Sequence, residues 1–194
     1  MSQKLHELQV FTEKNYIEKT ISGREFYQCT FEKCDFSKCS FVQVDFVDCV
    51  FNDCNFSLTK FKGTGVKEVQ FNRCKVVGVD FSACSDFLFS VNFDACQLDY
   101  AQFQGRKMKK TKFNACSLKE VDFSEADLTE SIFANSDLTR TTFQRTQLHK
   151  ADFRTAINFS IHPESNFMKK AKFSLDGLPG LLEKFDLVIE QKIS

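Results

Sequence analysis

A phenylalanine recurs at every fifth position early in the chain, and this period constrains the fold more than any other feature. The run comprises Phe26, Phe31, Phe36, Phe41, Phe46, Phe51, Phe56 and Phe61. An α-helix repeats about every 3.6 residues and a strand about every two, so neither produces a strict period of five. A short period held over most of a chain predicts a solenoid, in which each unit contacts only its neighbours.

The period continues beyond this run, with one slip. Central positions follow in fives to Phe81, and nearly every one has a small residue two places earlier. Between residues 82 and 90 the register shifts by two, so the next central residue is Leu88. A second run of Phe, Leu and Met then continues to Phe153. A Pro-containing loop at 158–167 follows, and one more clean unit surrounds Phe173.

These boundaries predict three segments. Residues 1–15 are expected to cap the first open edge of the solenoid, and residues 16–173 to form the repeats. Residues 174–194 begin with Gly and Pro and continue with apolar residues at helical spacing, followed by what could be a short strand. We expect this tail to cap the last coil, either alone or together with a dimer contact. Its apolar residues are Leu178, Leu181, Leu182, Phe185, Leu187 and Ile189.

The nine cysteines occupy the small-residue position, which elsewhere holds Ala, Val, Thr or Ser. A residue that alternates with alanine and valine serves as a small buried group. The odd count, in a chain whose first residues lack the apolar core of a secretory signal, also favours free thiols over disulfides. We therefore interpret the cysteines as packing residues and expect no metal and no cofactor.

The repeat units CDFSK, VDFVD, ADLTE, SDLTR and ADFRT resemble those of the pentapeptide repeat family. The resemblance implies an all-β, right-handed quadrilateral parallel β-helix of about seven coils, with about twenty residues per coil and a short C-terminal capping helix. Stacking each residue on the one twenty places later, and allowing for the slip, aligns five cysteines in one interior column. They are Cys34, Cys54, Cys74, Cys96 and Cys116.

No catalytic pattern stands out. The three histidines, His6, His149 and His162, lie far apart in sequence, and no Gly-rich phosphate loop, HExxH motif or nucleophile elbow is present. Many acidic residues precede a central residue, where the family places a side chain that bonds the turn; they include Asp35, Asp45, Asp122, Asp127, Asp137 and Asp152. We expect a protein that is not an enzyme.

The charges balance, with 26 basic and 26 acidic residues. This balance does not indicate direct binding to nucleic acid or to an anionic membrane. No apolar run reaches the roughly 18 residues of a membrane span. We expect a cytoplasmic protein.

One face of the solenoid is the best candidate for a partner-binding surface. It carries the slip, with Asp86 and Phe87, and one coil later the segment GRKMKK, in which Arg106 takes the inward small-residue position. Lys107, Lys109 and Lys110 point outward. The same face carries Glu25, Asp45, Asp48, Glu68, Asp127 and Glu130, together with Lys67 and Lys150. The alternative is that this face binds no partner. The slip would then be a tolerated insertion, and the lysines would be solvent-exposed residues at the rim of the rod.

Within the family, the chain is most similar to the Qnr-type fluoroquinolone-resistance proteins in its size, its Cys-rich opening FYQCTFEKCDFSKCSF and its ending GLPGLLEKFDLVIE. The resemblance implies a rod-shaped homodimer formed through the C-terminal segment. It also implies binding to DNA gyrase or topoisomerase IV and protection from quinolones, through an acidic prism proposed to mimic duplex DNA. A second hypothesis remains, that of a structural β-helix scaffold that binds an unrelated protein.

Overall fold

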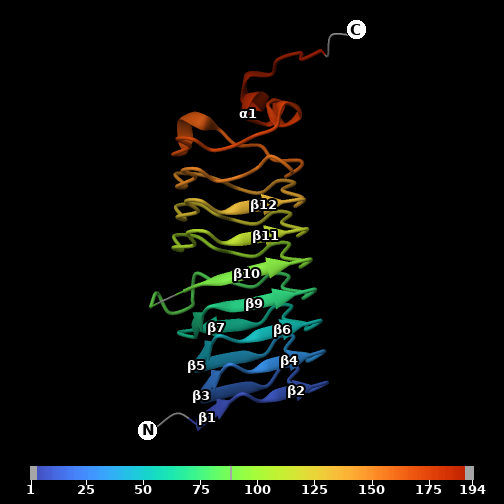
Figure 1. Cartoon of the computed structure of the whole chain (residues 1–194), viewed down its shortest axis with the longest axis vertical. Coiled ribbons are helices and arrows are strands. Elements are labelled where there is room, and N and C mark those ends of the chain that lie inside the picture. The colour runs from blue at the N-terminus through green and yellow to red at the C-terminus, as the bar shows by residue number, and fades with distance from the viewer. Residues whose placement is uncertain (1–3, 88, 191–194) are drawn as a thin grey trace.

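The computed structural model describes residues 4–87 and 89–190, and it shows a long four-sided rod wound from stacked coils (Figure 1). The N-terminal coil lies at one end of the rod, and the short helix α1 (Pro179–Leu182) lies at the other. The strands are β1 (Lys4–Glu7), β2 (Val10–Thr12), β3 (Thr20–Tyr27), β4 (Thr30–Glu32), β5 (Ser40–Val47), β6 (Val50–Asn52), β7 (Lys60–Lys62), β8 (Gly65–Lys67), β9 (Val69–Asn72), β10 (Val91–Asp94), β11 (Lys112–Asn114) and β12 (Ile132–Ala134).

Every strand pairing is parallel and joins one coil to the next. One sheet has the order β1-β3-β5-β7, with β8 also paired to β5, and the other has the order β12-β11-β10-β9-β6-β4-β2. Phe31 pairs with Phe51, so the coil length before the slip is twenty residues. Val69 then pairs with Val91, twenty-two residues later. The predicted parallel β-helix is confirmed.

Stacked phenylalanines fill the interior of the rod. The rings of Phe103 and Phe123 lie parallel on successive coils, with centroids 5.2 Å apart. Phe113 lies on the opposite side of the rod, and its ring meets that of Phe123 edge to face across the interior at 5.6 Å. Offset stacking and edge-to-face contact are the two arrangements that aromatic rings prefer. A period of five therefore builds a continuous aromatic core along the axis.

The corners of the rod explain the polar residues of the repeat. The residue two places after nearly every central residue has a left-handed backbone, as at Lys38 (φ 54°) and Glu120 (φ 57°). The residue before the centre bonds the turn, since the Asp122 carboxylate accepts from the Ser124 backbone N–H at 2.8 Å. The other predicted turn formers that accept such a bond are Asp35, Asp127, Asp137 and Asp152. Asp45 differs, because it lies within β5, where the backbone stays extended.

The N-terminal end of the repeat region differs from expectation, and the C-terminal end is irregular as expected. Residues 4–15, predicted as a separate cap, form the first coil, because β1 and β2 pair in register with β3 and β4. The ring of His6 takes a central position there and stacks on Phe26 at 4.9 Å. Residues 158–167, predicted as a loop, do interrupt the period of five: Asn158 at the expected central position is exposed, Phe159 is buried instead, and Pro163–Ser165 form the short helix η1. The twenty-residue spacing between coils is nevertheless kept, since Phe167 bridges to Gln147.

Leu88, the central residue predicted after the slip, lies outside the described residues. Its neighbour Phe89 is buried and packs edge to face against Phe81, with ring centroids 6.1 Å apart. The bulge at 82–90 therefore still supplies an aromatic ring to the core.

The C-terminal segment is helical, as its spacing predicts. It comprises the short helices η2 (Leu175–Gly177), α1 (Pro179–Leu182) and η3 (Glu183–Phe185). The Ile161 backbone N–H donates to the Gly180 carbonyl at 2.9 Å, and Leu181 packs against the core. Residues 187–189 form no strand with any described residue, so that part of the prediction is wrong. No helix in the described ranges is long and apolar enough to cross a membrane.

Candidate functional site

The cysteine column lies inside the rod and is structural. All nine thiols are free and buried. Cys34 Sγ donates to the Phe11 carbonyl at 3.2 Å, and Cys74 Sγ to the Phe51 carbonyl at 3.3 Å. The hydroxyl of Thr59 makes the same bond to the Phe36 carbonyl at 2.7 Å. The small-residue position thus accepts a short side chain with a hydrogen-bond donor, which explains why Cys, Ser and Thr share it.

Burial also makes several of these thiols poor nucleophiles. Desolvation raises the pKa of Cys84 to about 12, and it has the same effect on Cys49 and Cys116. The thiolate is the reactive and metal-binding form, so a raised pKa opposes both kinds of chemistry. Among residues 4–87 and 89–190, no group of three or more His, Cys, Asp or Glu is arranged to hold a metal ion.

The outer surface carries the more distinctive features. We define the bulge face as the side of the rod that contains the bulge (residues 82–90). Its interior central positions are Phe26, Phe46, Val66, Met108, Leu128 and Leu148. Strands β3, β5 and β8 form its first part. Beyond the bulge the coils are joined mainly by single bridges, such as that between Lys107 and Asp127.

Arg106 fastens the bulge to the wall of the rod. Its side chain is only 3% exposed, as expected for the inward position. Its guanidinium donates to the Cys84 carbonyl at 3.2 Å, to the Ser85 carbonyl at 2.7 Å and to Asp86 Oδ1 at 2.6 Å. It also lies 4.3 Å from the ring centroid of Phe89. Arg106 is therefore a structural clamp that the bulge largely covers, and its predicted contact with a partner stays a prediction.

Phe87 projects from the bulge and is 78% exposed. On the N-terminal side it borders a hollow of about 200 Å³ whose wall includes Gly65, Lys67 and Asp45. On the C-terminal side of the bulge a second hollow of about 310 Å³ is lined by Asp86, Phe89, Gly105, Arg106 and Lys107. Large exposed aromatic side chains beside a hollow are typical anchors of protein interfaces.

Charges on the bulge face separate by sign on either side of the bulge. The N-terminal part carries five acids, Glu7, Glu25, Asp45, Asp48 and Glu68, against three basic residues within the described coils, Lys4, Arg24 and Lys67. Glu25 stacks directly on Asp45. No ion pair involves these acids within the described ranges, so the negative charge of this part is not neutralised locally.

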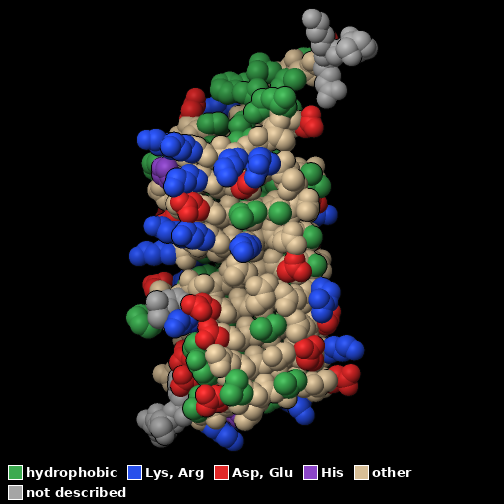
Figure 2. Space-filling model, viewed as in Figure 1, with side chains coloured by type: hydrophobic (Ala, Val, Ile, Leu, Met, Phe, Trp, Pro, Cys, Tyr) green, Lys and Arg blue, Asp and Glu red, His purple; other side chains and the backbone are tan. Residues whose placement is uncertain are grey.

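The C-terminal part of the face is basic. It carries Lys107, Lys109, Lys110, Lys150, Lys169 and Lys170, together with Asp127 and Glu130. Lys109 lies 3.4 Å from Asp127, and both Lys110 and Lys150 lie within 3.8 Å of Glu130. Figure 2 shows the same division along one edge of the rod, where blue side chains gather above the bulge and red ones below it.

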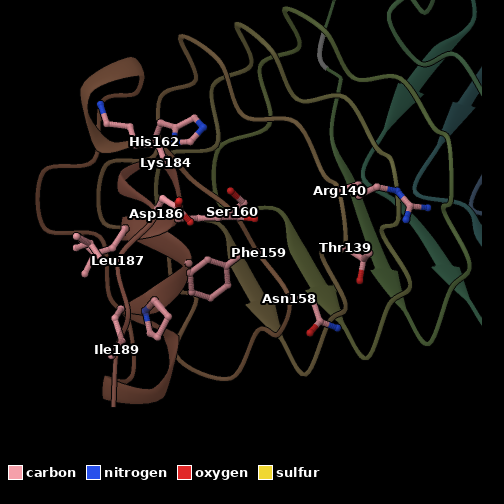
Figure 3. Close-up of a pocket in the computed structure, with 14 residues that line it drawn as sticks. Thr139, Arg140, Asn158, Phe159, Ser160, His162, Lys184, Asp186, Leu187 and Ile189 are labelled. Atoms are coloured by element: carbon pink, nitrogen blue, oxygen red, sulfur yellow. The ribbon is translucent and has the colours of Figure 1, made fainter. Parts of the chain in front are cut away.

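A third hollow lies at the C-terminal end of the rod (Figure 3). It has a volume of about 1050 Å³ and separates the last coil, which contributes Phe159 and His162, from the segment containing Lys184, Leu187 and Ile189. Of the predicted cap residues, Leu181 and Leu182 are half-buried. The others are exposed: Leu178, Phe185, Leu187 and Ile189.

The structure therefore gathers the bulge residues Asp86 and Phe87 and the lysines of GRKMKK on one face, as the sequence predicts. Three features were missed: the hollow beside Phe89, the clamp that Arg106 forms, and the reversal of charge across the bulge. The charge reversal was open to prediction, since ordering the acids and lysines of this face by coil would have revealed it. The other two depend on the local path of the bulge.

Comparison with known proteins identifies the family. A model of the pentapeptide repeat region matches residues 24–86 and 84–153, which together span more than half of the chain. The protein belongs to the pentapeptide repeat family. No curated protein sequence matches the chain.

The fold of this chain is also similar to that of several solved structures. Two structures of trypsin-treated QnrB1, a plasmid-mediated fluoroquinolone resistance protein, are each 15% identical in sequence. One covers 93% of this chain and 100% of that chain with a TM-score of 0.68, and the other covers 98% and 100% with a TM-score of 0.63. The protein HetL of the cyanobacterium Nostoc sp. strain PCC 7120 is 16% identical over 89% of both chains, with a TM-score of 0.41.

Proposed function

We propose that this protein is a non-enzymatic rod of the Qnr type, which acts in the cytoplasm by binding DNA gyrase or topoisomerase IV and protecting it from quinolones. The observation that carries the proposal is the acidic part of the bulge face. It lies on a rod whose fold is similar to that of QnrB1 over the whole length of the QnrB1 chain. Glu25 and Asp45 stack on neighbouring coils, about 4.8 Å apart, and no ion pair neutralises them within the described residues. A DNA strand presents its phosphates about 3.4 Å apart along the helix axis, which is a comparable spacing of negative charge.

A second candidate is a scaffold for an unrelated protein partner. Lys107, Lys109 and Lys110 favour it, because a surface that replaces DNA should be negative along its length. A partner with a basic part and an acidic part would match the bulge face better than a uniform DNA channel would.

The C-terminal end is our proposed site of homodimer formation. Phe185, Leu187 and Ile189 remain about half-exposed beside the large hollow, although they follow a helix that covers the last coil. An apolar patch at the end of a rod can meet itself across a two-fold axis, which would bury these side chains.

Direct binding is the test of the proposed function. The full-length protein would be immobilised, and purified gyrase and topoisomerase IV would be passed over it in a biolayer interferometry experiment. Phe87→Ala removes the projecting ring and should weaken binding by about tenfold or more, as expected for an interface anchor.

Leu58→Ala is the matched control. Leu58 is also a large exposed apolar residue, at 54%, but it lies at a corner away from the bulge face. Its replacement should leave binding unchanged. Absence of binding by the unaltered protein to either enzyme would contradict the topoisomerase proposal and favour the scaffold. Equal loss in both variants would contradict the placement of the site on the bulge face.

A further inference from the structure

The bulge face has a property that neither family membership nor the proposed function explains. It is acidic on one side of Phe87 and basic on the other, so a half-turn about an axis through the bulge exchanges the two signs. Surfaces that are complementary to themselves under a half-turn form isologous dimers, in which the same patch serves on both subunits. We propose that the bulge face binds the bulge face of a second copy of this chain, side by side and running in the opposite direction.

The coil order supports this pairing. With the axis at the level of the bulge, the coil of Lys107 and Lys110 on one copy lies opposite the coil of Glu68 on the other. In the same way, the coil of Lys150 lies opposite that of Glu25. Two levels also bring like charges together. Lys67 lies on the coil that faces Lys107, Lys109 and Lys110, and the coil of Asp127 and Glu130 faces that of Asp45 and Asp48. Lys109, Lys110 and Lys150 already bind Asp127 and Glu130 and reduce that repulsion.

The centre of the face has a matching shape. Phe87 is a projecting apolar side chain, and the 310 Å³ hollow lined by Phe89, Gly105 and Arg106 lies directly on the other side of the bulge. A two-fold axis between them carries the Phe87 ring of each copy toward the hollow of the other. The contact then has an apolar centre and a charged rim, which is the usual organisation of a protein interface.

Arg106 makes such a contact possible. Three hydrogen bonds from its guanidinium hold the bulge in place before any partner arrives. An interface that is already ordered loses less conformational entropy on binding. Arg106 Nε has no hydrogen-bond partner among the described residues, although it is buried at the edge of the same hollow.

This pairing requires only the protein itself, so it does not depend on topoisomerase binding. It also differs from the proposed C-terminal contact, which is apolar and should respond little to salt. Side-by-side pairing of opposite charges should weaken steeply as the Debye length falls from about 30 Å at 0.01 M salt to about 3 Å at 1 M.

Charge exchange gives the test. Every protein in the experiment would carry Ile189→Asp to disfavour the C-terminal contact, and sedimentation velocity would measure its mass at about 0.01 M and about 1 M NaCl. The parent protein, which carries Ile189→Asp and no other change, should form a dimer at low salt and be monomeric at high salt. One variant, Lys107→Glu with Lys110→Glu, removes the net positive charge of the C-terminal part, which then has four bases and four acids. A second variant, Asp48→Lys with Glu68→Lys, removes the net negative charge of the N-terminal part. Each should be monomeric alone, and an equimolar mixture of the two should dimerise.

Lys60→Glu with Lys62→Glu is the matched control. It changes the net charge by the same amount as the first variant, but on β7, which lies on another face. It should dimerise like the parent, and thermal unfolding should show that all variants are folded. The proposal is overturned if the parent is monomeric at low salt, if the first or the second variant dimerises alone, or if the mixture of these two stays monomeric.

Discussion

At the scale of single residues, each position of the repeat requires one physical property. The central position requires a large apolar side chain, most often an aromatic ring, because these side chains stack from coil to coil to fill the interior. The position two places earlier requires a short side chain, and where that side chain has a donor, as in Cys34 and Thr59, it bonds a buried carbonyl. The corner requires a residue that tolerates a left-handed backbone.

Truncating one ring of the stack should be costly. Phe123 is fully buried between Phe103 and Phe143, with ring centroids at 5.2 Å and 5.5 Å. We expect Phe123→Ala to lower the free energy of unfolding by about 3–5 kcal/mol, through lost burial and the cavity left behind. Chemical denaturation followed by circular dichroism would measure this, with the exposed Phe87→Ala as a nearly neutral control. A neutral Phe123→Ala would show that the inward assignment is wrong.

The thiols should be inert while the protein is folded. Burial raises the pKa of Cys39 to about 11 and that of Cys49 to about 12, so these two thiols carry almost no thiolate near pH 8. Hydrogen bonds from neighbouring thiols lower the pKa of Cys54 and that of Cys96, so these two are protected by their burial alone. We expect an aromatic disulfide reagent to label almost none of the nine cysteines in the native protein and all of them after denaturation. Rapid labelling of the native protein would contradict the buried column.

At the scale of elements, the bulge is an ordered insertion. Arg106→Met keeps an apolar side chain beside Phe89 but leaves the Cys84 and Ser85 carbonyls without their donor. A buried carbonyl that loses its partner costs about 1–3 kcal/mol, so we expect the bulge to open more often.

Chymotrypsin, which cleaves after exposed aromatic residues such as Phe87, provides the readout. Cleavage at the bulge should be faster in Arg106→Met than in the unaltered protein. Lys107→Met removes a neighbouring exposed charge that makes no ion pair with any described residue, and it should leave the rate unchanged. Equal rates in all three proteins would show that Arg106 does not hold the bulge.

The sequence predicts regular elements better than exceptions. The period of five and the cysteine column together predict the coil length and the two-residue slip, because each coil repeats the same physical demands. Local signals could not predict that Phe89 and Phe159 fill the core at irregular coils. At these coils the backbone departs from the regular repeat, and its local path decides which aromatic ring points into the interior. The same holds for Arg106, whose inward position is predictable but whose partners depend on the path of the bulge.

At the scale of the whole molecule, the rod is a one-dimensional array in which each coil is stabilised by its neighbours. The first coil has a neighbour on one side only within the described residues, and the outward residues of β1 and β2 are largely exposed. The last coil is covered by α1 and its flanking turns. The two ends should therefore differ in local stability.

Hydrogen exchange followed by mass spectrometry would detect this difference. Peptides from residues 4–15 should exchange before those from the central coils, because opening the first coil breaks one set of strand contacts instead of two. Peptides from β9 and β10 should be among the last. Uniform protection along the rod would contradict a stability that depends on neighbouring coils.

The balance of 26 acids and 26 bases gives the rod no net charge, yet the bulge face is divided into two parts of opposite sign. The acidic part is suited to a basic groove in a partner, and the division as a whole is suited to a second copy of the same face. These two kinds of contact use overlapping surfaces, so self-association should compete with partner binding.

The measurement that tests the functional account most directly is DNA supercoiling by gyrase in the presence of ciprofloxacin, with and without the purified protein. The account predicts that the protein at micromolar or lower concentration restores supercoiling, and that Phe87→Ala restores it less well than Leu58→Ala. No restoration by the unaltered protein, at any concentration that leaves gyrase itself active, would contradict the Qnr-type function.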